Sequence, residues 1–147
     1  MNLDTKIPPP IVTLIILTII YLFEIKEYEL NTKLISITIF SIGLVFIFSA
    51  VFQFIRIKTT VNPTKPHKTT TLVITGTYKI TRNPMYLGML LIIISFAFYK
   101  ASIISLILIP FFIFYINKFQ IEPEEFEMRK KFGKEYEDYC KKVDRWI

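Results

Sequence analysis

The chain has 147 residues, enough for one domain, and carries a net charge of +6. Apolar residues make up 52% and charged residues 20%, which excludes a disordered polyelectrolyte and argues against a soluble globular domain. The single Cys140 and the single His67 exclude a disulfide framework and a cysteine- or multi-histidine-based metal site. We therefore expect no bound metal.

Four uncharged runs predict helices that cross a membrane. A spanning helix needs roughly 17–25 apolar residues, and the runs are Ile7–Phe23, Leu34–Ile55, Asn83–Tyr99 and Ala101–Asn117. We expect the first run to be retained and not cleaved as a signal peptide, because prolines open it and no small-residue cleavage site follows. The predicted fold is a single all-α, integral-membrane domain with about four spans in two hairpins.

Basic residues are concentrated at one end of these predicted spans. The loop Arg56–Arg82 has six Lys or Arg and no acid, and the tail from Lys118 has eight, whereas Glu24–Lys33 and Lys100 together supply three. Since cytoplasmic loops hold the excess of Lys and Arg, we predict that both termini are cytoplasmic. The net charge then reflects topology and attraction to anionic lipids, and we expect no nucleic-acid partner.

The loop and the tail are predicted to cap the cytoplasmic side of the bundle. The loop lacks a helical period and has a short extended stretch at Leu72–Thr75. In the tail, Pro123 is predicted to open a helix whose positive dipole end is complemented by Glu124 and its acidic neighbours. Gly133 ends that helix, and Lys134–Val143 forms a second amphipathic one. Such a cap closes a polar pocket over the bundle.

Three groups of residues are candidates for chemistry: Gly76–Tyr78, Arg82–Gly88 and the pair Glu124–Glu125. Each group has an ordinary explanation, namely a turn glycine, a helix start with an interfacial tyrosine, and acids at a helix dipole. Together they bring an arginine, a tyrosine, a helix start and two carboxylates to one membrane depth. This combination suits a ligand that carries both charge signs, although spacing alone does not name it.

These residues resemble the isoprenylcysteine carboxyl methyltransferase and phospholipid methyltransferase family. The resemblance covers Thr59–Trp146, 88 of 147 residues, and leaves residues 1–58 as two spans without a motif. Its blocks are Thr59–Pro63, Leu72–Tyr78, Thr81–Gly88, Glu124–Phe126, Phe132–Tyr136, Tyr139 and Val143–Trp146. The resemblance implies a membrane methyltransferase that holds S-adenosylmethionine between the last spans and the C-terminal helices.

The same resemblance implies roles for individual residues. Cofactor contacts would fall on Thr70, Thr71, Leu72, Val73, Tyr78, Asn83, Pro84, Met85, Tyr86 and Glu124. Arg82 would hold the cytosolic opening of the site in place, at the start of the third predicted span. Glu125 would support the cofactor wall and is the nearest candidate base for an amine acceptor. Gln120 stands where the family has an arginine that orients the substrate.

The chain departs from the family pattern at two of these positions. Asn83 stands where a histidine is usual, and it keeps a donor and an acceptor but does not titrate near neutral pH. Gln120 lacks the charge that would hold a substrate carboxylate. An isoprenylcysteine-type carboxyl substrate is therefore less favoured.

The implied activity is methyl transfer from S-adenosylmethionine to a lipophilic or small hydrophobic acceptor, which is a carboxylate, a thiol or an amine. We expect a lipophilic acceptor to enter the site from the bilayer. The resemblance of the motif to bacterial members favours a bacterial inner membrane. One alternative is a phospholipid N-methyltransferase with the same cofactor site. Another is a non-catalytic membrane scaffold or transporter subunit, although a drug transporter would need an acid within a span and the four runs have none.

Overall fold

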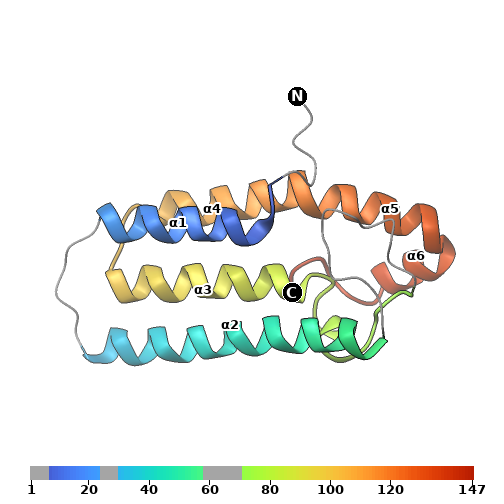
Figure 1. The fold of residues 1–147 in the computed structure, drawn as a ribbon, viewed down its shortest axis with the longest axis horizontal. Coiled ribbons are helices and arrows are strands. Elements are labelled where there is room, and N and C mark those ends of the chain that lie inside the picture. Colours follow the sequence, from blue (N-terminus) through green and yellow to red (C-terminus); the bar gives the residue numbers. More distant parts are fainter. Residues whose placement is uncertain (1–6, 24–29, 58–70) are drawn as a thin grey trace.

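The computed structural model describes residues 7–23, 30–57 and 71–147, and in these ranges every regular element is a helix (Figure 1). In chain order the elements are α1 (Pro9–Phe23), α2 (Leu30–Ile57), the 3₁₀ turn η2 (Gly76–Lys79), α3 (Pro84–Lys100), α4 (Ser105–Ile116), the π turn η3 (Asn117–Ile121), α5 (Glu122–Phe132) and α6 (Lys134–Cys140). The predicted all-α class is confirmed. The stretch predicted to be extended, Leu72–Thr75, lies in no strand and leads into η2.

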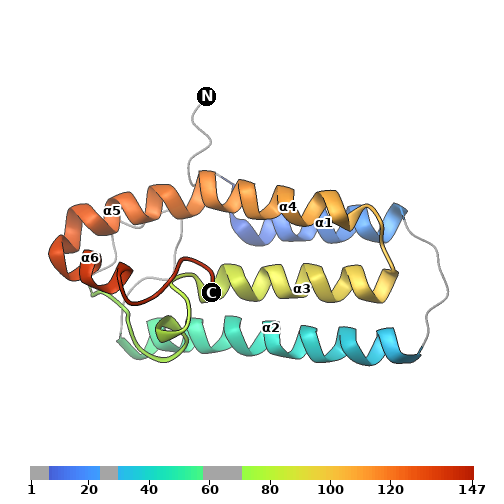
Figure 2. The same cartoon turned by 180° about the vertical axis from the view of Figure 1, so that it is seen from behind.

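The four long helices run alongside one another, and α5 and α6 project beyond them at one end (Figures 1 and 2). At that end α2 finishes, α3 begins and α4 continues into α5. The C-terminus returns to the start of α3. The topology therefore gathers the polar segments of the described chain at one end of an apolar bundle.

The central helix is α3, against which α1, α2 and α4 all pack. The most extensive contact is between α2 and α3, and α1 packs on α3 and α4 (Figures 1 and 2). The predicted hairpin of the first two spans does not describe this arrangement, because α3 lies between α1 and α2. Neighbours in the chain need not pack on each other when a later helix offers a closer fit.

Two glycines explain why α2 and α3 fit so closely. A Cβ atom on Gly88 would lie 2.6 Å from Ile47 Cγ1 and 2.7 Å from the Gly43 carbonyl oxygen. A Cβ atom on Gly43 would lie 2.9 Å from the Gly88 carbonyl oxygen. Small residues at a crossing let two backbones approach, which is the usual way helices pack in a membrane.

The helices bury one face and leave apolar residues exposed on the other. The core gathers Ile16 and Ile20 of α1, Ile93 of α3 and Phe112 of α4. Two helical stretches, Thr32–Arg56 and Ser105–Phe132, are long and apolar enough to cross a membrane, while α1 and α3 are shorter apolar helices. Four membrane spans remain a prediction.

The fourth long helix does not stop where the sequence predicted. α4, η3 and α5 are continuous, and Ile121 and Glu122 have helical φ and ψ. Pro123 lies in the first turn of α5, as predicted, but α5 continues the preceding helix and has no free start. The Glu122 N–H donates to the carbonyl of Asn117, five residues back, and this wider turn lets the helix pass a proline that has no N–H and whose ring crowds the preceding turn. Glu124 and Glu125 consequently do not lie at a free helix end.

The end of α5 and the helix after it follow the prediction. Gly133 terminates α5 with a φ of 49°, a value that favours glycine. α6 then buries Tyr136 and Tyr139, as expected of an amphipathic helix. It ends at Cys140, three residues before the predicted end.

The glycine crossing predicts that Gly88→Ala destabilises the bundle. The added methyl group would meet backbone and an Ile47 side chain that has little room to move, which costs about 1–3 kcal/mol. The unfolding midpoint of the detergent-solubilised protein, followed by circular dichroism, should fall by several degrees. The control is Ile107→Ala, because the Ile107 side chain is exposed on the outside of the bundle. An unchanged midpoint for Gly88→Ala would contradict the close packing of α2 on α3.

Candidate functional site

A tyrosine–carboxylate contact joins the start of α3 to α5. The Tyr86 hydroxyl donates a 2.5 Å hydrogen bond to Glu124 Oε1. Tyr86 lies in the first turn of α3 and is only 4% exposed. The bond therefore fixes the carboxylate of a C-terminal helix at the end of a central helix.

Tyr78 lies close to the same carboxylate. Burial raises the pKa of the Tyr78 hydroxyl far above its usual range, and the nearby Glu124 carboxylate and Tyr139 raise it further. The Tyr139 hydroxyl of α6 donates to the Tyr78 carbonyl oxygen at 2.6 Å. Tyr78 thus stays protonated and can donate a hydrogen bond.

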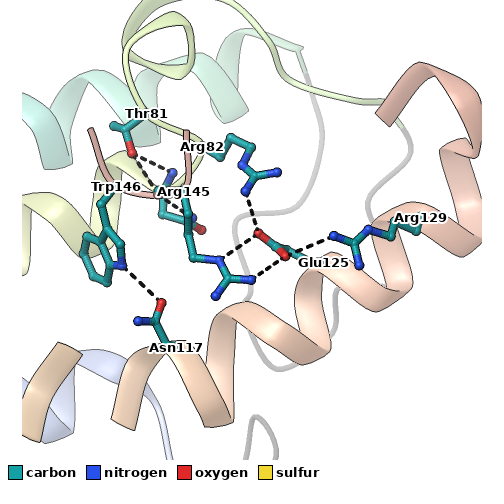
Figure 3. A network of polar contacts seen from close by, with 8 residues as sticks. Thr81, Arg82, Asn117, Glu125, Arg129, Arg145 and Trp146 are labelled. Carbon is teal, nitrogen blue, oxygen red and sulfur yellow. Dashed lines mark hydrogen bonds and ion pairs between the residues drawn. The ribbon is translucent and has the colours of Figure 1, made fainter. Parts of the chain in front are cut away.

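The neighbouring acid, Glu125, is surrounded by arginines (Figure 3). Arg145 contacts both carboxylate oxygens, with Nε 3.2 Å from Oε1 and Nη2 2.8 Å from Oε2. Arg82 Nη2 lies 3.2 Å from Oε1, and Arg129 Nη2 lies 3.6 Å from Oε2. The Glu125 side chain is 6% exposed, so this buried charge is compensated by guanidinium groups on both of its oxygens.

The C-terminal segment Asp144–Trp146 crosses the start of α3. The Arg82 N–H donates to the Asp144 carbonyl at 2.9 Å, and the Asn83 Nδ2 donates to the Arg145 carbonyl at 2.8 Å. Trp146 Nε1 donates to Asn117 Oδ1 at 3.1 Å (Figure 3). This segment therefore holds three elements, namely the turn before α3, the π turn and α5.

The loop before η2 is attached to α2 by Gln53. The Thr75 hydroxyl donates to Gln53 Oε1 at 3.1 Å. Gly76 has a φ of 61°, and a Cβ atom there would collide with the Gln53 amide. The backbone conformation therefore favours glycine at position 76, and a side chain there would also displace the Gln53 amide.

Most of the residues predicted for the site lie at this end of the bundle. Arg82, Tyr86, Glu124 and Glu125 meet in the contacts described above, and Asn83 bonds to the C-terminal segment. An adjoining apolar cluster contains Val73, Tyr78 and Met85, packed with Ala50 and Phe54 of α2. Pro84 is buried at the first position of α3, Leu72 is half-buried and Thr71 is exposed. Thr70 and His67 lie outside the described residues.

Gln120 is held differently from the other predicted residues. Its side chain is completely buried, and its Nε2 donates to the Ile7 carbonyl oxygen at 2.9 Å. Its Oε1 is buried and has no hydrogen-bond partner within residues 7–23, 30–57 and 71–147. Gln120 lies four residues before Glu124, so the two side chains share one face of the continuous helix.

Two residues of this site were not singled out from the sequence. Gln53 lies outside every recognised block, and Arg145 lies within the block Val143–Trp146 without an assigned role. The available signal for Arg145 was its place in the block Val143–Trp146, which the resemblance includes. In the described part of the chain, no group of three or more His, Cys, Asp or Glu side chains could hold a metal ion.

Comparison with known proteins extends the recognised region toward the N-terminus and ends before the block Val143–Trp146. The family model for phospholipid methyltransferases matches residues 31–135, which include α2, α3, α4 and α5. The chain belongs to the phospholipid methyltransferase family. Membership indicates a membrane methyltransferase, of a family whose members generally use S-adenosylmethionine. The match includes Tyr86, Glu124 and Glu125 and ends before Arg145.

A bacterial protein shares part of the sequence. A protein of Haemophilus influenzae, described as uncharacterized, is 40% identical over 63 residues. The aligned stretch is 43% of this chain and the whole of that protein. No solved structure matches.

The arginine network predicts that Glu125→Gln is strongly destabilising. Removing one partner of a buried ion pair leaves guanidinium groups uncompensated and costs about 3 kcal/mol. The matched control is Glu122→Gln, because Glu122 pairs with Lys118 at 2.9 Å on the exposed surface, where loss of a pair costs less than about 1 kcal/mol. Thermal unfolding in detergent should separate the two variants clearly. Equal midpoints would show that the Glu125 network contributes little.

Proposed function

We propose that this protein is an integral-membrane methyltransferase that binds S-adenosylmethionine where α3 meets α5 and methylates a lipophilic acceptor. The observation that carries the proposal is the Tyr86–Glu124 hydrogen bond within the region matched by the family model. It holds the Glu124 carboxylate at the polar end of an apolar bundle. The next residue, Glu125, lies 3.2 Å from the guanidinium group of Arg82. This arrangement suits a ligand with both charge signs that meets a substrate from the bilayer.

The residues present fit the chemistry of that cofactor. A carboxylate accepts hydrogen bonds from an ammonium group or from ribose hydroxyls, and in our proposal Glu124 supplies it. Tyr78, Asn83 and Tyr86 form polar and aromatic walls, and Val73 and Met85 provide apolar surface. Pro84 shapes the turn that carries these walls. Thr70, Thr71 and Leu72 complete the cofactor contacts that we propose from the resemblance.

In this reaction the protein mainly positions the methyl donor relative to the acceptor. The cofactor supplies an activated methyl group, so the chain has to align donor and acceptor and exclude water. Glu125 faces guanidinium groups on both oxygens and, in our proposal, positions α5 and does not act as a base. Carboxylate and thiolate acceptors need no base, whereas an amine has to react in its neutral form.

A second candidate acceptor is the amine of a phospholipid headgroup. The observation that favours it is the state of Gln120. Its Nε2 donates to the Ile7 carbonyl oxygen, and among the described residues its buried Oε1 has no hydrogen-bond partner. A carbonyl oxygen accepts a hydrogen bond from an amine or a hydroxyl and repels a carboxylate. Gln120 would therefore select an acceptor that carries a donor group.

We also propose that the site faces the cytosol and that both termini lie there, in a bacterial inner membrane. Among the described residues, Arg56, Lys79, Arg82 and Lys118 lie at the end that holds the site, whereas Lys100 lies at the other end, its Nζ 4.6 Å from the ring centre of Tyr21. The excess of basic residues marks the cytoplasmic side. A water-soluble cofactor reaches the site from that side.

The cofactor proposal predicts that Glu124→Gln weakens binding of S-adenosylmethionine. Loss of a charge-assisted hydrogen bond costs about 1.5–3 kcal/mol, which corresponds to roughly 10- to 100-fold in Kd. Isothermal titration calorimetry on detergent-purified protein measures this, with Glu122→Gln as the control on the same helix. Wild-type protein that is folded and does not bind would overturn the function. Binding that survives Glu124→Gln would overturn only the placement of the cofactor.

The acceptor is identified by following the labelled methyl group of S-adenosylmethionine. The wild-type protein is offered phosphatidylethanolamine vesicles, an S-prenylated cysteine with a free carboxylate, and a lipophilic thiol. Gln120 predicts N-methylated lipid as the main product. A base-labile methyl ester would instead show a carboxylate acceptor. No product from a protein that binds the cofactor would favour the scaffold alternative.

A further inference from the structure

We propose that Arg145 is a positioning residue of the site, which aligns Glu124 and Tyr86 without touching either. The inference rests on the proposed function, because its readout is binding of S-adenosylmethionine. Arg145 lies in the C-terminal segment Asp144–Trp146, outside the region that the family model matches. Its side chain contacts Glu125 on α5, and its backbone carbonyl accepts hydrogen bonds from the turn before α3 (Figure 3).

The side chain of Arg145 fixes the direction of α5. Its guanidinium group contacts both oxygens of Glu125, at 3.2 Å from Nε and 2.8 Å from Nη2. A two-point contact of this kind sets orientation as well as distance. Since Glu125 follows Glu124 on the helix, holding one side chain restricts the rotation that would carry the other away from Tyr86.

The backbone carbonyl of Arg145 fixes the start of α3. It accepts hydrogen bonds from Asn83 Nδ2 at 2.8 Å and from the Thr81 hydroxyl at 3.1 Å. The Asn83 N–H in turn donates to the Thr81 hydroxyl at 3.1 Å. Asn83 precedes α3 without capping it through its side chain, because that side chain is turned to Arg145. Tyr86 is three residues further along.

The side-chain and backbone contacts of Arg145 hold the two helices that carry the Tyr86–Glu124 hydrogen bond. The Tyr86 hydroxyl and Glu124 Oε1 belong to helices that are far apart in the sequence, and their 2.5 Å bond requires both helices to be held in register. Trp146 strengthens the attachment through its bond to Asn117 in η3. A residue tied to both helices is therefore well placed to control the geometry of the cofactor site.

Arg129 provides a matched control within the same network. It also contacts Glu125, but at 3.6 Å, from the same helix and with a side chain that is 56% exposed. It carries the same charge and cannot tie α5 to another element. Loss of Arg129 tests the effect of charge alone, and loss of Arg145 tests charge together with attachment.

The experiment compares Arg145→Gln, Arg145→Lys and Arg129→Gln with the wild-type protein in detergent. Calorimetric Kd values for S-adenosylmethionine and thermal midpoints are measured for each. We expect Arg145→Gln to weaken binding by about tenfold, Arg145→Lys to restore it only in part because an ammonium group cannot contact both oxygens, and Arg129→Gln to change Kd by less than about twofold. Should Arg145→Gln not fold, the comparison of Arg145→Lys with Arg129→Gln decides the question.

A double-mutant cycle tests whether Arg145 acts through Glu125. The loss of affinity in Arg145→Gln combined with Glu125→Gln should be smaller than the product of the two single losses, because both remove the same contact. Equal effects of the Arg145 and Arg129 variants, or a lowered midpoint with unchanged Kd, would overturn the positioning role. A folded wild-type protein that does not bind would overturn the proposed function as well, so the two failures are distinguishable.

Discussion

The contact between the start of α3 and α5 organises this end of the molecule. It contains one hydrogen bond from a buried tyrosine to Glu124 and one buried carboxylate, Glu125, contacted by guanidinium groups from three parts of the chain. A buried charge is stable only when its partners are in place. The central helix, the continuous α4–α5 helix and the C-terminal segment are therefore interdependent, and the polar groups meet where an apolar bundle ends.

Two features of the backbone make this contact possible. Gly43 and Gly88 bring α2 close to α3, so that α3 occupies the centre of the bundle with its first turn at the polar end. The π turn before Pro123 carries the fourth long helix past a proline and out of the bundle. Glu124 and Glu125 then lie on a helix that is rigidly joined to the apolar core. In our proposal, this site presents fixed polar groups to a ligand from the aqueous side and to an acceptor from the bilayer.

The sequence predicted the elements better than their pairing. Uncharged runs located the helices, and the blocks around Tyr86 and Glu124 indicated the family that the comparison shows. The sequence placed Pro123 at the start of α5 correctly but did not predict that α4 continues into α5, because local propensity does not reveal a change from α to π hydrogen bonding. The pairing of the first two spans was missed, since close approach at Gly43 depends on a partner distant in the sequence. Arg145 had no predicted role, because its partner Glu125 is 20 residues away.

The central claim is that the junction of α3, α5 and the C-terminal segment forms one cofactor site. Hydrogen–deuterium exchange of the detergent-solubilised protein, with and without saturating S-adenosylmethionine, tests it most directly. The account predicts that slowed exchange is concentrated in residues 81–87, 122–126 and 143–147, while the opposite end of the bundle around Lys100 is unchanged. Protection confined to other regions, or none in a folded protein, would contradict it.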